Sequence, residues 1–221
     1  MPRSPRIQFE GAYYHVFNRG VAKQAITFDE RDCRTFMQLL GETVTKFQLR
    51  LFAYCLMKNH YHLFLQTLLP NLELALQRLQ GEYVRYVNFR HERVGSLFQG
   101  RYKSRLVEAD AYALTLIRYI HQNPVEAGIV SNPEDYPWSS YPCYVQKLPR
   151  WPWLDTEWTF QQLDSKEDRA VVLFQALHEK TASEPEREKF ERMTRILGSK
   201  AFKLTTLLRE SKKGVRLLKG V

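Results

Sequence analysis

The chain has 221 residues, and its 44% hydrophobic and 13% aromatic content excludes a largely disordered protein. Its 33 Lys and Arg against 24 Asp and Glu give a formal net charge of +9, and a protein this basic commonly meets a polyanion, most often nucleic acid. Three widely spaced cysteines argue against a disulfide framework, and no apolar run approaches the roughly 20 residues of a membrane span, so we expect a cytoplasmic protein without a membrane partner.

Strand and helix patterns alternate along the first half of the chain. Aromatic and β-branched residues or alternation predict the strands, helical spacing of apolar residues predicts the helices, and Asp29 is a plausible N-cap. In chain order the expected elements are a strand at 11–17, a helix at 29–47, strands at 48–57 and 60–67, a helix at 71–91, a strand at 101–108 and a helix at 110–122 that ends at Asn123-Pro124. This order predicts an α+β, ferredoxin-like antiparallel sheet with helices on one face.

The composition changes after Pro124. Residues 131–158 are rich in proline and hold all four tryptophans, which predicts a segment wrapped over the first domain. Short helices are expected at 165–180 and 186–197, and residues 199–221 carry seven Lys and Arg against one Glu. We therefore predict three parts: a first domain at 1–130, the Pro/Trp-rich wrapping segment at 131–158, and a basic helical C-terminal extension at 159–221.

His60 and His62 stand two residues apart in the third expected strand. Residues i and i+2 of a strand point to one face, so two imidazoles can chelate one metal ion there. Taken alone, a His-x-His pair is common and more often reflects two unrelated histidines on a polar face.

Tyr119 and Asn123 are four residues apart and share a face at the end of the last expected helix. An amide oxygen from Asn123, added to two imidazoles, leaves positions open for water and phosphate. Such a set suits Mg²⁺ or Mn²⁺ better than a closed zinc site. A divalent cation would favour the phenolate of Tyr119, whose ordinary pKa is about 10, and would polarise a phosphate. Taken alone, Tyr119 is readily explained as a core aromatic, because tyrosine is often buried with its hydroxyl hydrogen-bonded.

Three cations alternate along the strand expected at 101–108. Arg101, Lys103 and Arg105 would line one face with no acidic residue between them, and such a row can follow phosphates. The alternative is an exposed strand face whose charges discourage aggregation. Aromatic residues that could stack on unpaired bases, or simply fill the core, are Tyr13, Tyr14 and Tyr61.

Several separated motifs resemble one family. AYCLMKNHYHLFLQT, around His60 and His62, is similar to the HUH motif of the single-tyrosine transposases. LFQGRYKSRLVEADAYALTLIRYIHQNPVEAGIV, with YYHVFNRG and DYPWSSY, resembles the branch called REP-associated tyrosine transposases, which are linked to repetitive extragenic palindromes. The resemblance covers roughly residues 8–145, and residues 160–221 resemble no family.

The resemblance implies an RRM-related, ferredoxin-like fold and metal-dependent cleavage and rejoining of single-stranded DNA at hairpins. It implies a 5′-phosphotyrosine intermediate on Tyr119, with Mg²⁺ or Mn²⁺ held by His60, His62 and Asn123. It also implies a possible homodimer, because related insertion-sequence enzymes share their sites between subunits. The family often has Pro where this chain has Lys58, which alters the hairpin turn. The residues expected to contact DNA are Arg19, Lys58, Arg101, Lys103 and Arg105.

Three hypotheses follow from these residues. A DNA nuclease that rejoins strands explains the charge, the histidine pair, the Tyr–Asn spacing and the basic strand together. A non-catalytic regulator that binds DNA or RNA hairpins would need the basic strand and the aromatics alone. A hydrolase using metal-activated water would leave Tyr119 structural, and a covalent protein–DNA adduct separates it from the first hypothesis.

Overall fold

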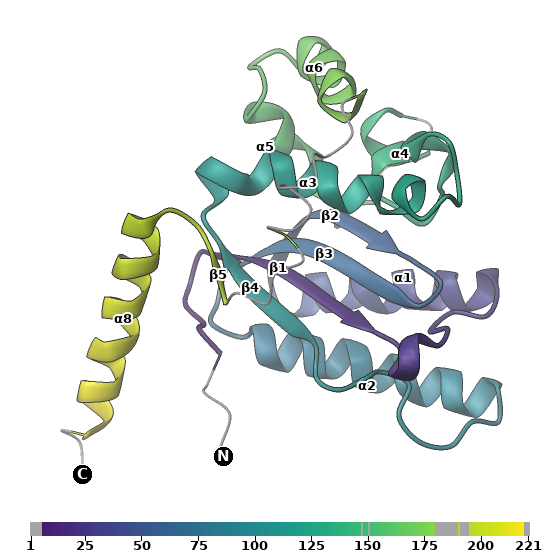
Figure 1. Ribbon diagram of the computed structural model, residues 1–221, viewed down its shortest axis with the longest axis horizontal. Coiled ribbons are helices and arrows are strands. Elements are labelled where there is room, and N and C mark those ends of the chain that lie inside the picture. The colour runs from purple at the N-terminus through teal and green to yellow at the C-terminus, as the bar shows by residue number, and fades with distance from the viewer. Residues whose placement is uncertain (1–5, 147, 150, 180–189, 191–194, 219–221) are drawn as a thin grey trace.

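The computed structural model describes residues 6–146, 148–149, 151–179, 190 and 195–218. Its centre is a mixed five-stranded sheet in the order β2-β3-β1-β4-β5 (Figure 1). The first four strands pair antiparallel, and β5 is parallel to β4. The α+β class and the order of the predicted elements through the fourth strand are confirmed. The strands are β1 (Ala12–Arg19), β2 (Leu49–Leu56), β3 (His60–Thr67), β4 (Lys103–Val107) and β5 (Ile196–Leu197).

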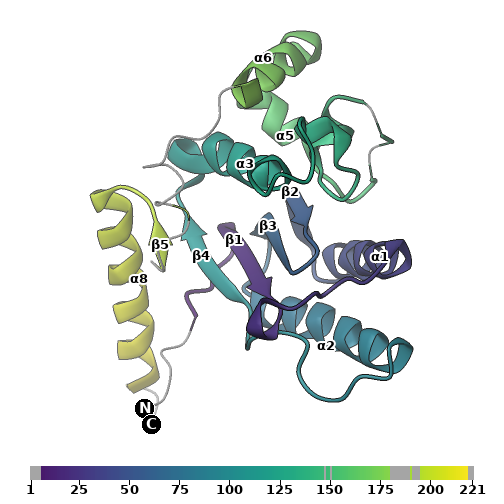
Figure 2. The same cartoon turned by 45° about the vertical axis from the view of Figure 1, so that its right-hand side comes forward.

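Helices cover both faces of the sheet, whereas the sequence predicts helices on one face. Helices α1 (Glu30–Lys46) and α2 (Leu72–Arg90) lie on one side, and α3 (Ala109–Glu126) lies on the other (Figure 2). Residue alternation in β3 explains the arrangement. Tyr61 contacts Phe36 of α1 and accepts a hydrogen bond from Gln80 of α2, while its neighbours His60 and His62 face α3. The strands are apolar on both sides, so each side requires a cover.

Helix α3 continues through Pro124 to Glu126, although the sequence predicts its end at residue 122. Pro124 has no N–H for the carbonyl of Ile120, which would ordinarily break the helix. The side chain of Asn123 donates to that carbonyl instead, at 3.4 Å, and so partly replaces the missing bond. The helix is followed by Gly128, whose φ of +67° suits glycine.

Both edges of the sheet are covered by chain that follows α3. On the β2 edge, Leu56 N–H donates to the carbonyl of Trp138 at 2.9 Å, and Asp155 N–H donates to Leu51 at 2.8 Å. On the β4 edge, β5 adds a two-residue parallel strand. The short helical turns η2 (Pro133–Asp135), α4 (Tyr141–Tyr144) and α5 (Thr156–Gln161) belong to this covering chain. Its contacts agree with a wrapping role for residues 131–158, while the three-part division stays a prediction.

A chain of hydrogen bonds through the core joins α3 to α6 (Glu167–Glu179). His178 Nδ1 donates to the carbonyl of Phe174 at 2.8 Å, so its Nε2 is free to accept from His121 Nδ1 at 3.0 Å. Nε2 of His121 then accepts from the hydroxyl of Ser140 at 2.6 Å. Both rings are buried, and one carbonyl therefore fixes both tautomers.

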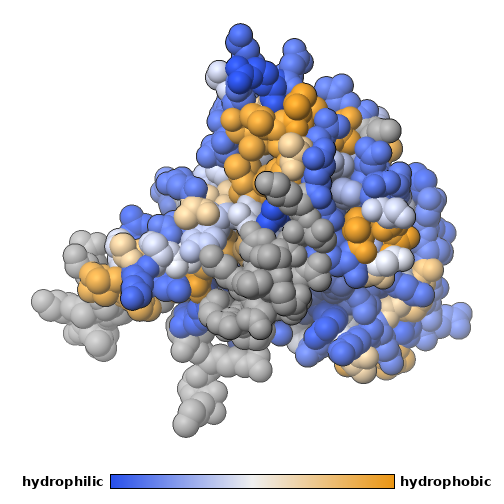
Figure 3. Space-filling view, turned by 45° about the horizontal axis from the view of Figure 1, so that its top comes forward, coloured by the Kyte–Doolittle hydropathy of each residue, from blue (hydrophilic) through white to orange (hydrophobic). Residues whose placement is uncertain are grey.

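The C-terminal part differs in detail from the prediction. α6 matches the helix expected at 165–180, whereas the helix expected at 186–197 falls mostly outside the described residues, and its end is β5, a strand. α8 (Lys200–Leu218) extends along one side of the molecule (Figure 1). A mostly hydrophilic surface with separate hydrophobic areas is visible in Figure 3. No helix among the described residues is long and apolar enough to cross a membrane.

Candidate active site

The structure brings His60 and His62 of β3 together with Tyr119 of α3 between the sheet and this helix. The rings of His60 and His62 have centroids 5.1 Å apart and planes at 89°, and both lie on the α3 side of β3. Tyr119 projects from α3 towards His62, with ring centroids 5.6 Å apart. Alternation in the strand and packing of α3 over it thus bring Tyr119 together with side chains 57 and 59 positions earlier in the chain.

Asn123 faces His60 with its amide oxygen. Its Nδ2 donates to the carbonyl of Tyr119 at 2.7 Å, which turns Oδ1 towards His60 Nε2, 3.5 Å away. His60 Nδ1 lies 2.7 Å from Oδ1 of Asn59, whose Nδ2 in turn donates to the carbonyl of Lys23. Asn59 Oδ1 can therefore only accept, so Nδ1 carries the proton of the neutral His60 ring. Two lone pairs, on His60 Nε2 and Asn123 Oδ1, consequently face each other.

This arrangement fits a divalent cation. Facing lone pairs repel unless a cation or a proton lies between them, and imidazole and amide oxygen both bind Mn²⁺ or Mg²⁺. The described residues contain no group of three or more His, Cys, Asp or Glu side chains able to hold a metal. The donors for such an ion would be His60, His62 and the amide of Asn123, with the other positions left to water and phosphate.

Burial keeps the histidines of the site neutral. It lowers the pKa of His60, against the opposing effect of Asn123. It also holds the pKa of His62 well below the ordinary value, and His15, His60 and Arg105 lower it further. A metal ligand must offer a lone pair, so neutral rings at neutral pH are the form a metal site requires.

Tyr119 is 6% exposed and lies beneath a residue from the C-terminal part of the chain. Its ring centroid is 5.0 Å from that of Phe190, which is itself buried. Arg105 donates through NH1 to the carbonyl of Phe190. Phe190 is therefore held through its backbone by Arg105 and through its ring by Tyr119. Sequence reasoning missed Phe190, because nothing in its surroundings resembles the motifs.

The predicted row of cations is divided in the structure. Arg101 precedes β4 and is exposed, and Lys103 is half-buried. Arg105 is 2% exposed, with its guanidinium 4.9 Å from the ring of Phe17, so it does not share an open surface with the other two cations, and its contact with DNA stays a prediction. The bulk of Phe17 and Phe190 beside the strand covers it. Arg19 and Lys58, by contrast, are exposed, at the end of β1 and in the β2–β3 turn.

The aromatic residues considered for base stacking are engaged in packing. Tyr14 and Tyr61 are buried on the α1 and α2 side of the sheet. Tyr13 packs between Phe64 and Trp158, with centroid distances of 6.1 and 5.4 Å. Of the two readings considered for these tyrosines, the structure supports the core one.

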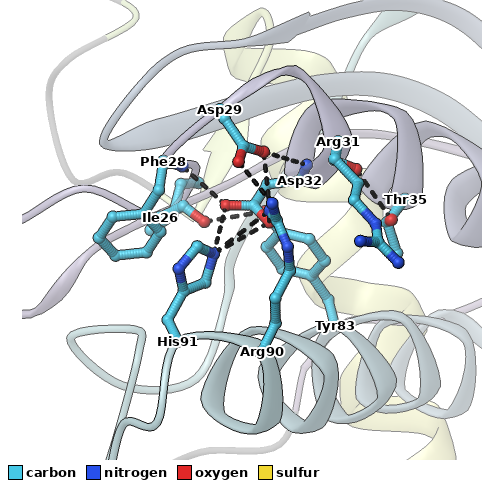
Figure 4. A network of polar contacts seen from close by, with 9 residues as sticks. All are labelled: Ile26, Phe28, Asp29, Arg31, Asp32, Thr35, Tyr83, Arg90 and His91. Atoms are coloured by element: carbon cyan, nitrogen blue, oxygen red, sulfur yellow. Dashed lines mark hydrogen bonds and ion pairs between the residues drawn. The ribbon is translucent and has the colours of Figure 1, made fainter.

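A polar network fixes the loop that precedes α1 (Figure 4). The buried carboxylate of Asp32 accepts from Phe28 N–H at 2.8 Å, from Arg90 at 2.5 Å, and lies 2.9 Å from His91 Nε2. Arg90 also binds Asp29, and this contact lowers the pKa of the Asp29 carboxyl. Asp29 is the N-cap of α1, as predicted, through its bond from Asp32 N–H.

This loop in turn supports the turn beside His60. Ile26 N–H donates to the carbonyl of Lys58 at 2.7 Å, and Gly20 N–H donates to the carbonyl of Asn59 at 2.8 Å. The turn between β2 and β3 is thus held by hydrogen bonds from the segment between β1 and α1, whose end next to α1 is fixed by the polar network around Asp32. Lys58, at the position where the related family often has Pro, takes part through its backbone while its side chain is exposed.

The family of the chain follows from a comparison with known families. A family model described as "Transposase IS200 like" matches residues 8–123, more than half of the chain. The chain belongs to the IS200-like transposases. The matched span includes His60, His62, Tyr119 and Asn123, whereas Phe190 lies outside it.

Two solved structures resemble this IS200-like transposase. One, described as a REP-associated tyrosine transposase bound to a REP hairpin, has a TM-score of 0.57 at 13% identity and covers 66% of this chain and 87% of that one. The other, a putative transposase from Deinococcus radiodurans R1, is 21% identical, with a TM-score of 0.39 over 55% of this chain and 97% of that one. No curated protein sequence matches the chain. The first likeness shows a shared fold.

Proposed function

We propose that this IS200-like transposase cleaves and rejoins single-stranded DNA at hairpins such as REP palindromes, with Tyr119 as nucleophile. The observation that carries the proposal is the meeting of Tyr119 with His62, 5.6 Å between ring centroids, beside the facing lone pairs of His60 and Asn123. A tyrosine hydroxyl, two neutral imidazoles and an amide oxygen are the groups that metal-assisted phosphoryl transfer requires.

The residues of the site divide the work as follows. His60, His62 and Asn123 would hold Mg²⁺ or Mn²⁺, which supplies charge neutralisation at the scissile phosphate. Tyr119 Oη forms a bond to phosphorus as the bond from phosphorus to the 3′ oxygen breaks, and the 3′ oxygen ends with a proton equivalent to the one the tyrosine loses. The 5′-phosphotyrosine link conserves the bond energy, so attack by a 3′-hydroxyl rejoins the strand without ATP.

Exposed cations near this end of the sheet support contact with the DNA backbone. Arg19 lies beside the loop that leads to Arg101, because Gln99 N–H donates to the carbonyl of Arg19 at 2.9 Å. Together with Lys58 and Lys103 they would neutralise phosphates, and this contact depends on salt. The bound hairpin of the structurally similar REP-associated transposase agrees with this class of partner. Cytoplasmic location and a possible homodimer remain part of the proposal.

A hairpin-binding protein that does not cut DNA is the second candidate. The observation in its favour is the 6% exposure of Tyr119, which lies against Phe190 and would have to be uncovered before it could reach a phosphate. Binding through exposed cations requires no such change.

Incubation with a labelled single-stranded hairpin and Mn²⁺ or Mg²⁺, followed by a denaturing gel, tests the proposal. Hairpins would be drawn from the genomic neighbourhood of the gene. Wild type is expected to give a covalent protein–DNA band that Tyr119→Phe does not give. Tyr112→Phe, on the same helix, is the matched control and should behave as wild type.

Each result on a well-bound hairpin has a separate meaning. An adduct formed by Tyr119→Phe would exclude Tyr119 as the nucleophile. Cleavage without any adduct would favour hydrolysis by activated water. Binding without cleavage in either metal would favour the non-catalytic hairpin-binding protein.

A further inference from the structure

A third histidine lies directly behind the proposed metal ligands. His15, in β1, is fully buried, and its Nε2 is 2.9 Å from Nδ1 of His62. The two rings have centroids 5.2 Å apart and planes 19° from parallel. In the register of β1 and β3, Phe17 lies directly opposite His62 and His15 is its diagonal neighbour. The contact therefore follows from strand pairing rather than from sequence spacing.

The hydrogen bond between His15 and His62 has two possible directions. If His62 Nδ1 carries the proton and donates, then Nε2 of His62 is a lone pair. If His15 Nε2 donates, then Nε2 of the neutral His62 ring carries a proton and cannot bind a metal ion. The identity of the donor thus decides whether His62 can serve as a ligand.

His60 and His62 differ in how this choice is made. Asn59 Oδ1 accepts the Nδ1 proton of His60, and the bond from Asn59 to Lys23 fixes that direction. His15 has no comparable anchor, because its Nδ1 is buried without a hydrogen-bond partner among the described residues. The pair can therefore adopt either direction, and a cation at Nε2 of His62 would select one of them.

We propose that His15 is the positioning residue for His62: it accepts the Nδ1 proton, orients the ring and leaves Nε2 as the metal-binding lone pair. The inference rests on the proposed metal site of this transposase. Hydrogen-bond partners of ligating histidines fix ring orientation and raise ligand basicity, and their loss typically weakens metal binding by about 10- to 100-fold.

Metal titration of the full chain without DNA tests this role. Mn²⁺ binding would be measured by calorimetry for wild type, His15→Phe, which keeps a ring but loses the acceptor, and His15→Gln, whose amide oxygen can accept. His15→Phe is expected to bind Mn²⁺ about 10- to 100-fold more weakly, and His15→Gln to recover most of that loss. Phe17→Leu is the matched control, since it changes the packing beside His62 without changing its hydrogen bond, and should bind nearly as wild type.

Histidine nitrogen NMR of the wild-type protein provides a second readout that does not depend on a variant folding. With saturating Mg²⁺, His62 is expected to show a protonated Nδ1 and a bare Nε2. Persistence of the Nε2 proton, or wild-type Mn²⁺ affinity in a folded His15→Phe, would overturn the role of His15.

The failure of this inference is distinguishable from failure of the proposed function. Wild type that forms the tyrosine adduct while His15→Phe binds Mn²⁺ normally would overturn the positioning role and leave the chemistry intact. Wild type that binds no Mn²⁺ and shows no metal-dependent change at His62 would overturn both.

Discussion

Acid is expected to destabilise the folded chain by about 2 kcal/mol through His178 alone when the pH falls from 7.5 to 5.0. Burial lowers the pKa of His178 to about 4, and its Nε2 accepts from His121 in the hydrogen-bonded chain that joins α3 to α6. A proton on Nε2 of His178 would face the N–H of His121, so protonation breaks that chain. In the unfolded state the same ring titrates near its ordinary pKa of about 6.5.

The sign and size follow from these two pKa values. Because the folded pKa is the lower one, the unfolded state takes up the proton first as the pH falls. The contribution of His178 is complete above about pH 6.5 and is lost progressively between about 6.5 and 4. Each pH unit in that window costs about 1.4 kcal/mol, which gives about 2 kcal/mol over the 1.5 units between 6.5 and 5.0.

Urea unfolding followed by tryptophan fluorescence at several pH values measures this loss. In His178→Gln the fall in unfolding free energy between pH 7.5 and 5.0 should be about 2 kcal/mol smaller than in wild type. Val171→Ala is the control, because it trims an apolar side chain of the same helix that packs against the core and removes no titrating group, and its pH dependence should equal that of wild type. An identical fall in wild type and His178→Gln would refute the reasoning.

Two further predictions concern the DNA footprint and the loop network. Arg101→Ala should weaken hairpin binding and reduce the slope of log affinity against log salt by about 1, as measured by fluorescence anisotropy. The control Arg34→Ala, on α1, should leave this slope unchanged. An unchanged slope in Arg101→Ala would exclude Arg101 from the DNA-contacting residues. Asp32→Asn should lower the unfolding free energy by roughly 2 kcal/mol in urea titrations, because a buried carboxylate loses its charge-assisted bonds, whereas the exposed Glu30→Gln should cost less than about 0.5 kcal/mol. Equal losses of unfolding free energy in Asp32→Asn and Glu30→Gln would contradict the argument that burial makes the Asp32 contacts the stronger ones.

The local patterns in the sequence were sufficient for the element order and for part of the site. Alternation in a strand fixes the shared face of His60 and His62, and helical periodicity fixes that of Tyr119 and Asn123. The predicted end of α3 was wrong because the helix continues through Pro124. The side chain of Asn123 donates to the carbonyl of Ile120, which Pro124 leaves without an N–H donor, and a rule based on proline alone does not include this bond.

Contacts between distant segments account for the features that the sequence did not predict. The pairing of His15 with His62 depends on the register of β1 against β3, and the burial of Arg105 depends on Phe190, 85 positions later. The placement of α3 on the second face of the sheet is likewise a packing result. One signal was present in the sequence: His15 is a strongly polar residue inside the apolar and aromatic run 12–17, which indicates a buried partner.

The covered edges of the sheet have a consequence for shortened versions of the chain. A version ending at residue 130 would keep His60, His62, Tyr119 and Asn123, yet it would lose both the residues bonded to β2 and the strand β5. Unpaired strand edges are templates for pairing with other chains. Such a truncated protein is therefore expected to self-associate edge to edge and to aggregate, even though every residue of the proposed chemistry is present.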